Sequence, residues 1–140
     1  MNRKTLLALP GAIATAAAVT ASPLALAASS GPAVAVQVKT PTKTLVNATV
    51  HGETGSITKG GTPKGICPGK SAAGALDAAT HGRWKGTYYS SVPGIFVTSI
   101  VGVTPKGSHY WAFLVNGKTS NSGICAVKLK AGQKLLFKVK

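Results

Sequence analysis

The segment YWAFLVNG, residues 110–117, constrains the fold of this chain more than any other stretch. Its first six residues are all apolar or aromatic, whereas a strand with one solvated face alternates apolar and polar side chains. The Asn116-Gly117 pair that follows is typical of a type I′ turn, because both central positions of that turn need positive φ. We therefore predict a central strand that is covered on both faces and followed by a tight hairpin.

A single helix is predicted, in the segment SAAGALDAAT (71–80). Its apolar residues recur at helical spacing, Ser71 stands where an N-cap residue is expected, and Gly82 follows the helix end. Small alanine side chains allow such a helix to lie close to a sheet, and we expect it to cover one face of the strand at 110–115. The other face is expected to meet strands or a loop held by a disulfide.

Most of the remaining chain is predicted to form strands, because it is rich in β-branched and aromatic residues between turn residues. The last segment, KLLFKVK (134–140), puts alternate apolar side chains on one face and lysines on the other, as in an edge strand that resists pairing with other chains. A glycine-rich loop is predicted at 51–65. Further strands are predicted at residues 34–38, 44–50, 87–91, 94–103 and 123–129.

The N-terminus is typical of a secretory signal peptide. Arg3 and Lys4 precede an Ala/Leu-rich run, and Ala25-Leu26-Ala27 is a small-x-small cleavage site. A retained membrane anchor is the alternative, but alanines and prolines make a poor span, since transmembrane helices need about 20 strongly apolar residues. We expect a secreted protein, extracellular or associated with the cell envelope, with no transmembrane anchor after cleavage. The predicted organisation is a signal peptide at 1–27, a flexible leader at 28–33 and one domain at 34–140.

The charge balance is extreme. The sequence contains 16 Lys and Arg residues against two acidic residues, Glu53 and Asp77, which gives a formal net charge of +14. Such a chain is drawn to anionic surfaces at low salt. Nucleic acid is not the expected partner, because the chain is predicted to be exported and carries no recognisable nucleic-acid-binding motif.

The two cysteines, Cys67 and Cys125, predict one disulfide, because exported proteins with an even cysteine count usually pair them. The alternative is two buried thiols. The bridge would close a long loop and contribute about 4 kcal/mol in the chain-entropy model. No metal site is predicted, since neither cysteine has a neighbouring residue of ligand type and the histidines are scattered.

Catalysis is not predicted. A catalytic triad would have to pair a histidine with one of the two carboxylates, and no serine stands in a nucleophile-elbow pattern. Asp77 falls in the helix and is interpreted as a solvated residue, while His109 lies beside the aromatic strand and is interpreted as turn-exposed. A small secreted hydrolase is a remote alternative, and no cofactor is expected. The histidines available to such an enzyme are His51, His81 and His109.

Three segments in a fixed order carry a family resemblance: GIFVTSIVGV, YWAFLVNGK and GICAVKLKAGQKLLFKV. The matching positions are Phe96, Val97, Ile100, Gly102, Tyr110, Trp111, Phe113, Val115, Asn116, Gly117, Gly123 and Gly132. On these residues the chain resembles a bacterial family of domains of unknown function (DUF4430-like) that is similar to the C-terminal β domain of transcobalamin and intrinsic factor. The resemblance covers roughly residues 34–140 and is most specific at 94–117.

The resemblance implies an α+β fold, predominantly antiparallel β with one short helix, β-grasp-like and in a single domain. It also implies a corrinoid-like ligand. The chain departs from the family pattern at Ala131-Gly132-Gln133, where the family commonly has Asp-Gly-Asp. It also lacks the large helical domain that holds cobalamin in the transcobalamin-like proteins.

The first functional hypothesis is a non-catalytic binding module for an unknown small molecule or protein partner. Its ligand-binding candidates form an aromatic platform of Tyr88, Tyr89, Tyr110 and Trp111, with Asn116 at the hairpin tip. The alternative is that Trp111 belongs to the core and that Asn116 only shapes the turn.

The second hypothesis is charge-driven adhesion to anionic polymers of the cell envelope. Residues two apart share a strand face, so lysines in the C-terminal hairpin are expected to form one positive stripe. Arg83 and Lys85, which flank Trp84, form a smaller basic-aromatic cluster, and the alternative is a solvated, solubilising surface. The anion-binding candidates are Lys128, Lys130, Lys134, Lys138 and Lys140.

Overall fold

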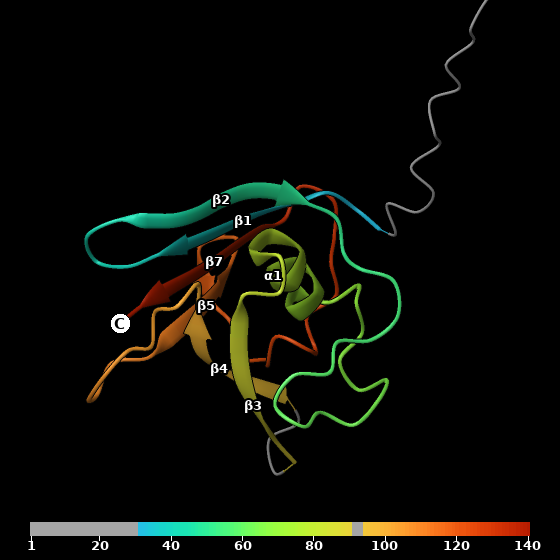
Figure 1. Cartoon of the computed structure of the whole chain (residues 1–140). Coiled ribbons are helices and arrows are strands. Elements are labelled where there is room, and N and C mark those ends of the chain that lie inside the picture. The colour runs from blue at the N-terminus through green and yellow to red at the C-terminus, as the bar shows by residue number, and fades with distance from the viewer. Residues whose placement is uncertain (1–30, 91–93) are drawn as a thin grey trace, which may run out of the picture.

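Two β-sheets and one helix make up the fold (Figure 1). The computed structural model describes residues 31–90 and 94–140, so the predicted signal peptide at 1–27 lies outside the described residues. Among the described residues no helix is long and apolar enough to span a membrane. The elements are β1 (Val34–Lys39), β2 (Thr44–Val50), α1 (Ala72–Thr80), β3 (Trp84–Tyr89), β4 (Gly94–Ile100), β5 (Trp111–Val115), β6 (Lys118–Thr119) and β7 (Lys134–Val139).

The larger sheet has five strands in the order β2-β1-β7-β5-β6, and β3 pairs with β4 in a separate two-stranded sheet. Neighbouring strands are antiparallel except β1 and β7, which run parallel. Helix α1 contacts β1, β2 and β3, while β4 approaches β5 beside it. The predicted α+β class, predominantly antiparallel with one short helix in a β-grasp-like single domain, is confirmed.

The core lies between the larger sheet and the layer formed by α1 and the β3–β4 pair. On β1 and β7, Val36 pairs with Leu135 and Val38 pairs with Phe137, and all four side chains are buried. The ring of Phe113 stacks on that of Phe137 with 4.9 Å between centroids. The second layer contributes the buried residues Ala72, Ala73, Ala75, Leu76, Trp84, Ile95, Val97 and Ile100.

The segment before β7 caps the helix. The N–H groups of Ala72 and Ala73 donate to the carbonyl oxygens of Val127 and Ile124, at 2.9 and 3.1 Å. Ser71 holds the N-cap position, but its hydroxyl donates to the Pro68 carbonyl and caps no helix N–H. The predicted side-chain cap is therefore wrong, because backbone carbonyls from a distant segment already accept these N–H groups.

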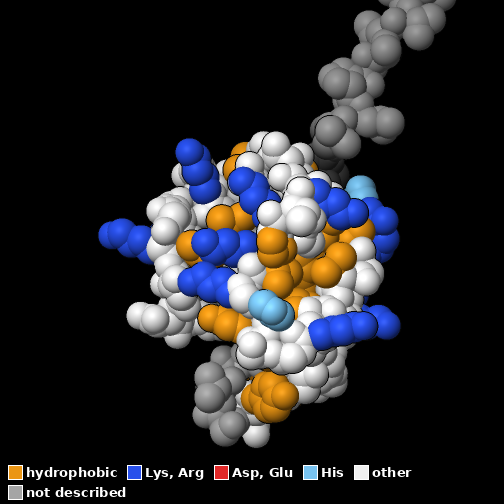
Figure 2. Space-filling model, turned by 90° about the vertical axis from the view of Figure 1, so that its left-hand side faces the viewer, with side chains coloured by type: hydrophobic (Ala, Val, Ile, Leu, Met, Phe, Trp, Pro, Cys, Tyr) orange, Lys and Arg blue, Asp and Glu red, His pale blue; other side chains and the backbone are white. Residues whose placement is uncertain are grey.

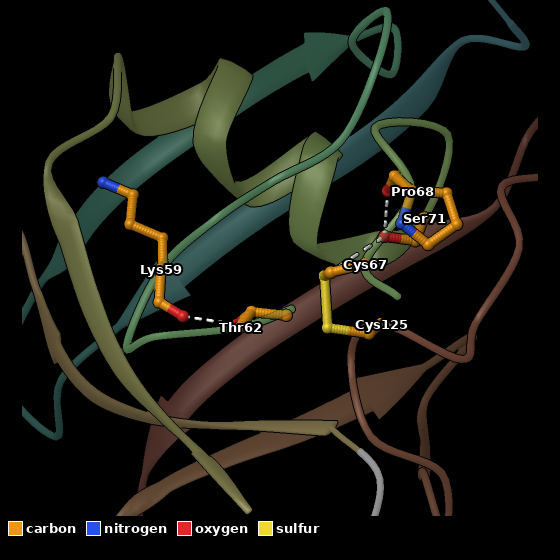
Figure 3. The surroundings of a disulfide bond; sticks show 6 residues. All are labelled: Lys59, Thr62, Cys67, Pro68, Ser71 and Cys125. Carbon is orange, nitrogen blue, oxygen red and sulfur yellow. Dashed lines mark hydrogen bonds between the residues drawn. A yellow bond between two sulfur atoms is a disulfide. The ribbon is translucent and has the colours of Figure 1, made fainter. Parts of the chain in front are cut away.

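The predicted disulfide between Cys67 and Cys125 is confirmed (Figure 3). The two residues are 58 apart in sequence, their Cα atoms are 4.5 Å apart, and both are buried. The bridge ties the loop before α1 to the segment that caps α1. Residues 123–129 are irregular and do not form the predicted strand. The carbonyl oxygens of Ile124 and Val127 accept hydrogen bonds from the first N–H groups of the helix, and only Lys128 forms a β-bridge, to Ser71.

Two strands occupy places other than those predicted. KLLFKVK was expected at an edge, but β7 lies in the middle of the sheet because β1 pairs with it in parallel on one side and β5 pairs with it on the other. YWAFLV was expected to be central, but β5 lies next to the two-residue strand β6. Sequence alone does not reveal the parallel β1–β7 pairing, which joins the two ends of the domain.

The two faces of β5 are covered differently from the prediction. On the core face, Trp111 meets the turn after β4 and donates its Nε1–H to the Val103 carbonyl at 3.1 Å. On the open face, Ala112 and Leu114 are only 5% and 8% exposed although no helix packs there. Their register partners on β7, Lys138 and Leu136, are long enough to cover them. Helix α1 covers β1 and β2 and not β5.

Of two turns with positive φ, one follows the sequence expectation and the other does not. Asn116 and Gly117 have φ of 50° and 82°, so the predicted type I′ hairpin between β5 and β6 is confirmed. Val101 and Gly102 have φ of 47° and 78°, and they reverse the chain so that Ile100 bridges to Val103. This turn ends β4 earlier than the predicted strand at 94–103.

Candidate functional site

One end of the larger sheet concentrates positive charge. The parallel strands β1 and β7 both end there, and β5 begins there. We name this surface the basic end, and it consists of Lys39, Lys43, Lys106, Lys138 and Lys140 together with His109 and Tyr110. Figure 2 looks onto the molecule from the side where the C-terminus lies in Figure 1, and Lys and Arg side chains gather there around hydrophobic ones. None of the described side chains visible on that face is acidic.

Backbone hydrogen bonds hold the basic end together. Tyr110 and Lys140 exchange two N–H···O bonds, each of 3.0 Å. Nδ1 of His109 lies 3.1 Å from the Lys140 carbonyl oxygen, and the His109 N–H donates to the Lys106 carbonyl at 3.2 Å. The loop before β5 is therefore fixed against the C-terminus, and the 46%-exposed ring of Tyr110 stands beside the terminal lysine.

Two lysines of the basic end face each other across the parallel pair. Lys39 on β1 and Lys138 on β7 are direct partners in register. Their neighbours Val38 and Phe137 are buried in the core, so the two lysines share the open face. Like charges in directly opposite positions destabilise a sheet by about 0.2–1 kcal/mol. Both acidic side chains of the chain lie elsewhere, so neither of them relieves this repulsion.

The chain's two acidic side chains meet beside α1, in what we name the acidic cluster: Glu53, Asp77, Lys59 and Trp84. Asp77 Oδ1 accepts the Nε1–H of buried Trp84 at 2.6 Å and lies 3.7 Å from Lys59 Nζ. Lys59 Nζ also donates to the Gly82 carbonyl at 2.8 Å and lies 5.4 Å from the centre of the Trp84 ring. The interpretation of Asp77 as a solvated residue is therefore wrong.

The loop that carries Lys59 is pressed onto β3. The Tyr88 N–H donates to the Gly60 carbonyl at 3.3 Å. Gly60 has φ of 59°, and a Cβ there would come within 2.1 Å of the Gly86 oxygen, so only glycine fits. Thr62 donates its hydroxyl to the Lys59 carbonyl and closes the turn (Figure 3).

Glu53 is the titrating member of the acidic cluster. Burial, a hydrogen bond to Asp77 and the negative charge of Asp77 raise the pKa of Glu53 from its ordinary 4.5 to about 7, while the positive charge of Lys59 acts in the opposite direction. Two neighbouring carboxyl groups disfavour the doubly ionised state. The pair therefore holds a proton near neutral pH.

The structure does not assemble the predicted aromatic platform in one place. Trp111 is 5% exposed and belongs to the core, as the alternative interpretation had it. Tyr110 and Asn116 flank β5 at opposite ends, and the Asn116 Oδ1 accepts the Lys134 N–H at 2.9 Å. Tyr88 and Tyr89 lie on β3, in the other sheet, where Tyr89 is 52% exposed and Tyr88 is half-buried.

The structure contains only part of the predicted lysine stripe. Lys134, Lys138 and Lys140 follow the open face of β7 at two-residue spacing, interrupted only by the apolar Leu136. Lys128 and Lys130 lie in the irregular segment before β7, so their predicted pairing on a strand face is wrong. Lys138 and Lys140 join the basic end, whereas Lys134 lies at the opposite end of β7 beside Asn116.

Sequence reasoning missed three lysines of the basic end and the composition of the acidic cluster. Lys39, Lys43 and Lys106 meet the C-terminus only through the parallel β1–β7 pair and the loop before β5. The sequence signal for this cluster was the scarcity of acidic residues, since Glu53 and Asp77 are the only two in a very basic chain. Within residues 31–90 and 94–140, no group of three His, Cys, Asp or Glu side chains could hold a metal ion.

The family model "Domain of unknown function (DUF4430)" matches residues 69–140. The chain belongs to this family. At the level of sequence it matches no curated protein.

Among solved structures, the fold is similar to that of a protein from Ruminococcus gnavus ATCC 29149 described as a candidate metal-binding protein, with a TM-score of 0.55 and 14% identity over 78% of this chain and 96% of that one. It is also similar to haptocorrin in complex with Cbi, with a TM-score of 0.54 and 18% identity over 81% of this chain. The match spans 26% of the haptocorrin chain. These likenesses support the fold assigned above.

Proposed function

We propose that the chain is a secreted, non-catalytic binding module that attaches to an anionic polymer of the cell envelope through its basic end. The observation that carries the proposal is the direct pairing of Lys39 with Lys138 on an open sheet face that holds no acidic side chain. A bound anion offsets the repulsion between these two ammonium groups. The signal peptide at 1–27, removed on export, would place the domain where such polymers occur.

The arrangement suits an extended polymer better than a small ion. Lys43 and Lys106 stand in turns on either side of the strand ends, so the positive charge extends beyond the Lys39–Lys138 pair. The exposed Tyr110 ring adds an amphipathic contact next to Lys140. Long-range attraction of this kind speeds association and weakens as salt screens it.

A catalytic role has little support in the same geometry. Asp77 is engaged by Trp84 and Lys59, and its neighbour Glu53 lies in the acidic cluster and not at the basic end. His109 lies against a main-chain oxygen of Lys140, and no acidic side chain orients it. A corrinoid-like ligand stays a prediction from the resemblance, because the likeness to haptocorrin shows the fold alone.

The test uses the purified protein, with its disulfide formed, on polyphosphate-coupled resin and on uncoupled resin. A variant with Lys39→Gln, Lys138→Gln and Lys140→Gln is compared with a control that carries Lys64→Gln, Lys70→Gln and Lys118→Gln, three exposed lysines elsewhere. The net charge of the two variants is the same. Elution is followed from about 50 to about 500 mM salt, where the screening length shrinks several-fold.

We expect the parent protein and the control variant to elute at similar, high salt and the basic-end variant to elute much earlier. Equal losses in the two variants would mean that net charge alone drives retention and that the basic end is no site. Absence of retention of the parent protein at about 50 mM salt would overturn the proposed function.

A further inference from the structure

The β3–β4 pair carries a second surface that is independent of the basic end. An open cleft of about 870 Å³ runs along the start of β3 and the turn after β4. Its cationic side chains are Lys59, Arg83 and Lys85, and the hydroxyls of Ser99 and Thr104 line it as well. No acidic side chain lines this cleft.

Two of these cations, Arg83 and Lys85, have no carboxylate partner in the described part of the chain. Lys59 forms an ion pair with Asp77, the one ion pair found among the described residues. Arg83 donates its Nε–H to the Thr80 carbonyl at 3.1 Å, which orients the guanidinium and leaves its terminal nitrogens for a ligand. Lys85 is exposed on β3. Arginine and lysine in this setting suit a carboxylate, which the guanidinium fork can bind in a bidentate manner.

The same face continues from the cleft to an exposed aromatic pair. In the β3–β4 register Lys85 lies opposite Ser99, Thr87 opposite Phe96, and Tyr89 opposite Gly94. On β3 the residues Lys85, Thr87 and Tyr89 are exposed and those between them are half-buried, and on β4 Phe96 is exposed between two buried residues, so these side chains face away from the core. The side chains of Tyr89 and Phe96 are 52% and 47% exposed and stand diagonally across the two strands, within reach of one another.

The distances along this face define the shape of the ligand. Lys85 and Tyr89 are four residues apart on one strand, which corresponds to about 13 Å. A cationic cleft at one end and two exposed rings at the other therefore call for an elongated molecule with an acidic group and a ring. The rings of Tyr89 and Phe96 offer flat apolar faces against which the C–H face of a sugar packs, and Thr87 lies between the two ends.

We propose that the outer face of the β3–β4 pair binds an acidic oligosaccharide, with its carboxylate at Arg83 and Lys85 and a sugar ring on Tyr89 and Phe96. Each half of the site discriminates by its own chemistry. Neutral sugars leave the cations unpaired, and simple anions leave the aromatic pair uncovered. This proposal does not rest on the basic end, and either surface can fail without the other.

The test is calorimetric titration of the purified protein with tetragalacturonate, with maltotetraose as the neutral sugar and inorganic phosphate as the simple anion. Two variants address the two halves of the site: Arg83→Gln with Lys85→Gln, and Tyr89→Ala with Phe96→Ala. All four side chains are largely solvent-exposed, and thermal unfolding verifies that each variant is folded. The control variant Lys64→Gln with Lys118→Gln removes two positive charges from exposed positions outside both this face and the basic end.

We expect tetragalacturonate to bind the parent protein and the control variant equally. Each site variant should lower its affinity about tenfold or more, equivalent to about 1.4 kcal/mol. Maltotetraose and phosphate should bind more weakly than tetragalacturonate. Affinity that survives Tyr89→Ala with Phe96→Ala would reduce the site to a simple anion cleft and overturn the proposal, as would the absence of tetragalacturonate binding to the parent protein.

Discussion

The acidic cluster and the basic end differ in how their charged side chains are paired. Beside α1, Asp77 accepts a hydrogen bond from buried Trp84 and pairs with Lys59, so each charge has a partner within the fold. At the end of the larger sheet, five lysines lie on neighbouring strand ends and turns, and two of them, Lys39 and Lys138, are direct register partners. Both acidic side chains of the chain lie in the first region.

The difference separates groups that stabilise the fold from groups that are available to a partner. Removing a member of the acidic cluster leaves a buried polar group unpaired, which lowers the free energy of unfolding. Removing a lysine of the basic end relieves repulsion and should cost no stability. The two regions can therefore be told apart by substitutions that change charge by the same amount.

The largest expected effect concerns the disulfide, which ties the loop leading into α1 to the segment that caps α1. Replacing Cys67 and Cys125 with serine should lower the free energy of unfolding by about 4 kcal/mol, because the bridge spans 58 residues. Denaturant unfolding measures the loss. At a temperature where the variant is still folded, retention on polyphosphate should be unchanged; a loss of retention in the folded variant would show that the basic end depends on this loop.

The next effect concerns Asp77. The variant Asp77→Ala should lower the free energy of unfolding by about 2 kcal/mol, because the buried Trp84 Nε1–H loses its acceptor and Lys59 loses its counterion. Asp77→Asn keeps an acceptor oxygen and should lose less. Urea unfolding of both variants checks this order, and a stability equal to that of the parent protein in both would mean that Asp77 is solvated after all.

The fold could be predicted from sequence wherever the signals were local. The strands at 34–39 and 44–50, the helix at 72–80 and the Asn116-Gly117 hairpin were readable from side-chain pattern and turn chemistry. The positions of β5 and β7 in the sheet were not, because the parallel pairing of the first and last strands leaves no trace in either segment. Residues 123–129 look like a strand locally, and their role as a helix cap appears only when α1 is docked.

The candidate site was predictable in its chemistry and not in its geometry. The lysine excess indicated an anionic partner, and Tyr110, Lys138 and Lys140, which were singled out as candidates for an aromatic platform and a lysine stripe, lie together at the end of the larger sheet. Trp111 was left open between a platform and a core position, because a strand that is apolar on both faces does not show which face is the core. Phe96, which is 47% exposed, was missed because its neighbours in sequence are buried.

A smaller effect should appear as a pH dependence of the acidic cluster. The pKa of Glu53 is about 7 in the folded protein against an ordinary value of 4.5, so the folded state holds a proton that the unfolded state has lost between these values. The contribution of Glu53 to stability is therefore full below pH 4.5 and is lost as the pH rises through about 7. After discounting for solvent screening we expect a change of about 1 kcal/mol.

The variant Glu53→Gln isolates this change, because it keeps the shape of the side chain and removes the proton equilibrium. The parent protein should lose stability relative to the variant between pH 5 and pH 8, the interval that contains the pKa of about 7. Urea unfolding at several pH values gives the difference directly. Parallel pH profiles for the two proteins would mean that Glu53 titrates alike in the folded and unfolded states.

The smallest effect tests the basic end in the absence of any partner. Lys39→Gln should raise the free energy of unfolding by about 0.5 kcal/mol at low salt, because it removes one of two like charges in direct register across β1 and β7. Lys43→Gln, four residues along in the turn, makes the same change in net charge without a register partner and serves as the control. Thermal unfolding at low and high salt measures both, and the gain should vanish at high salt, where the repulsion is screened.

Because an anionic polymer should stabilise the parent protein more than the Lys39→Gln variant, the order of the two melting temperatures should reverse when polyphosphate is added. A gain of equal size in both variants would assign the effect to net charge and remove the Lys39–Lys138 pair from the argument for an anionic partner.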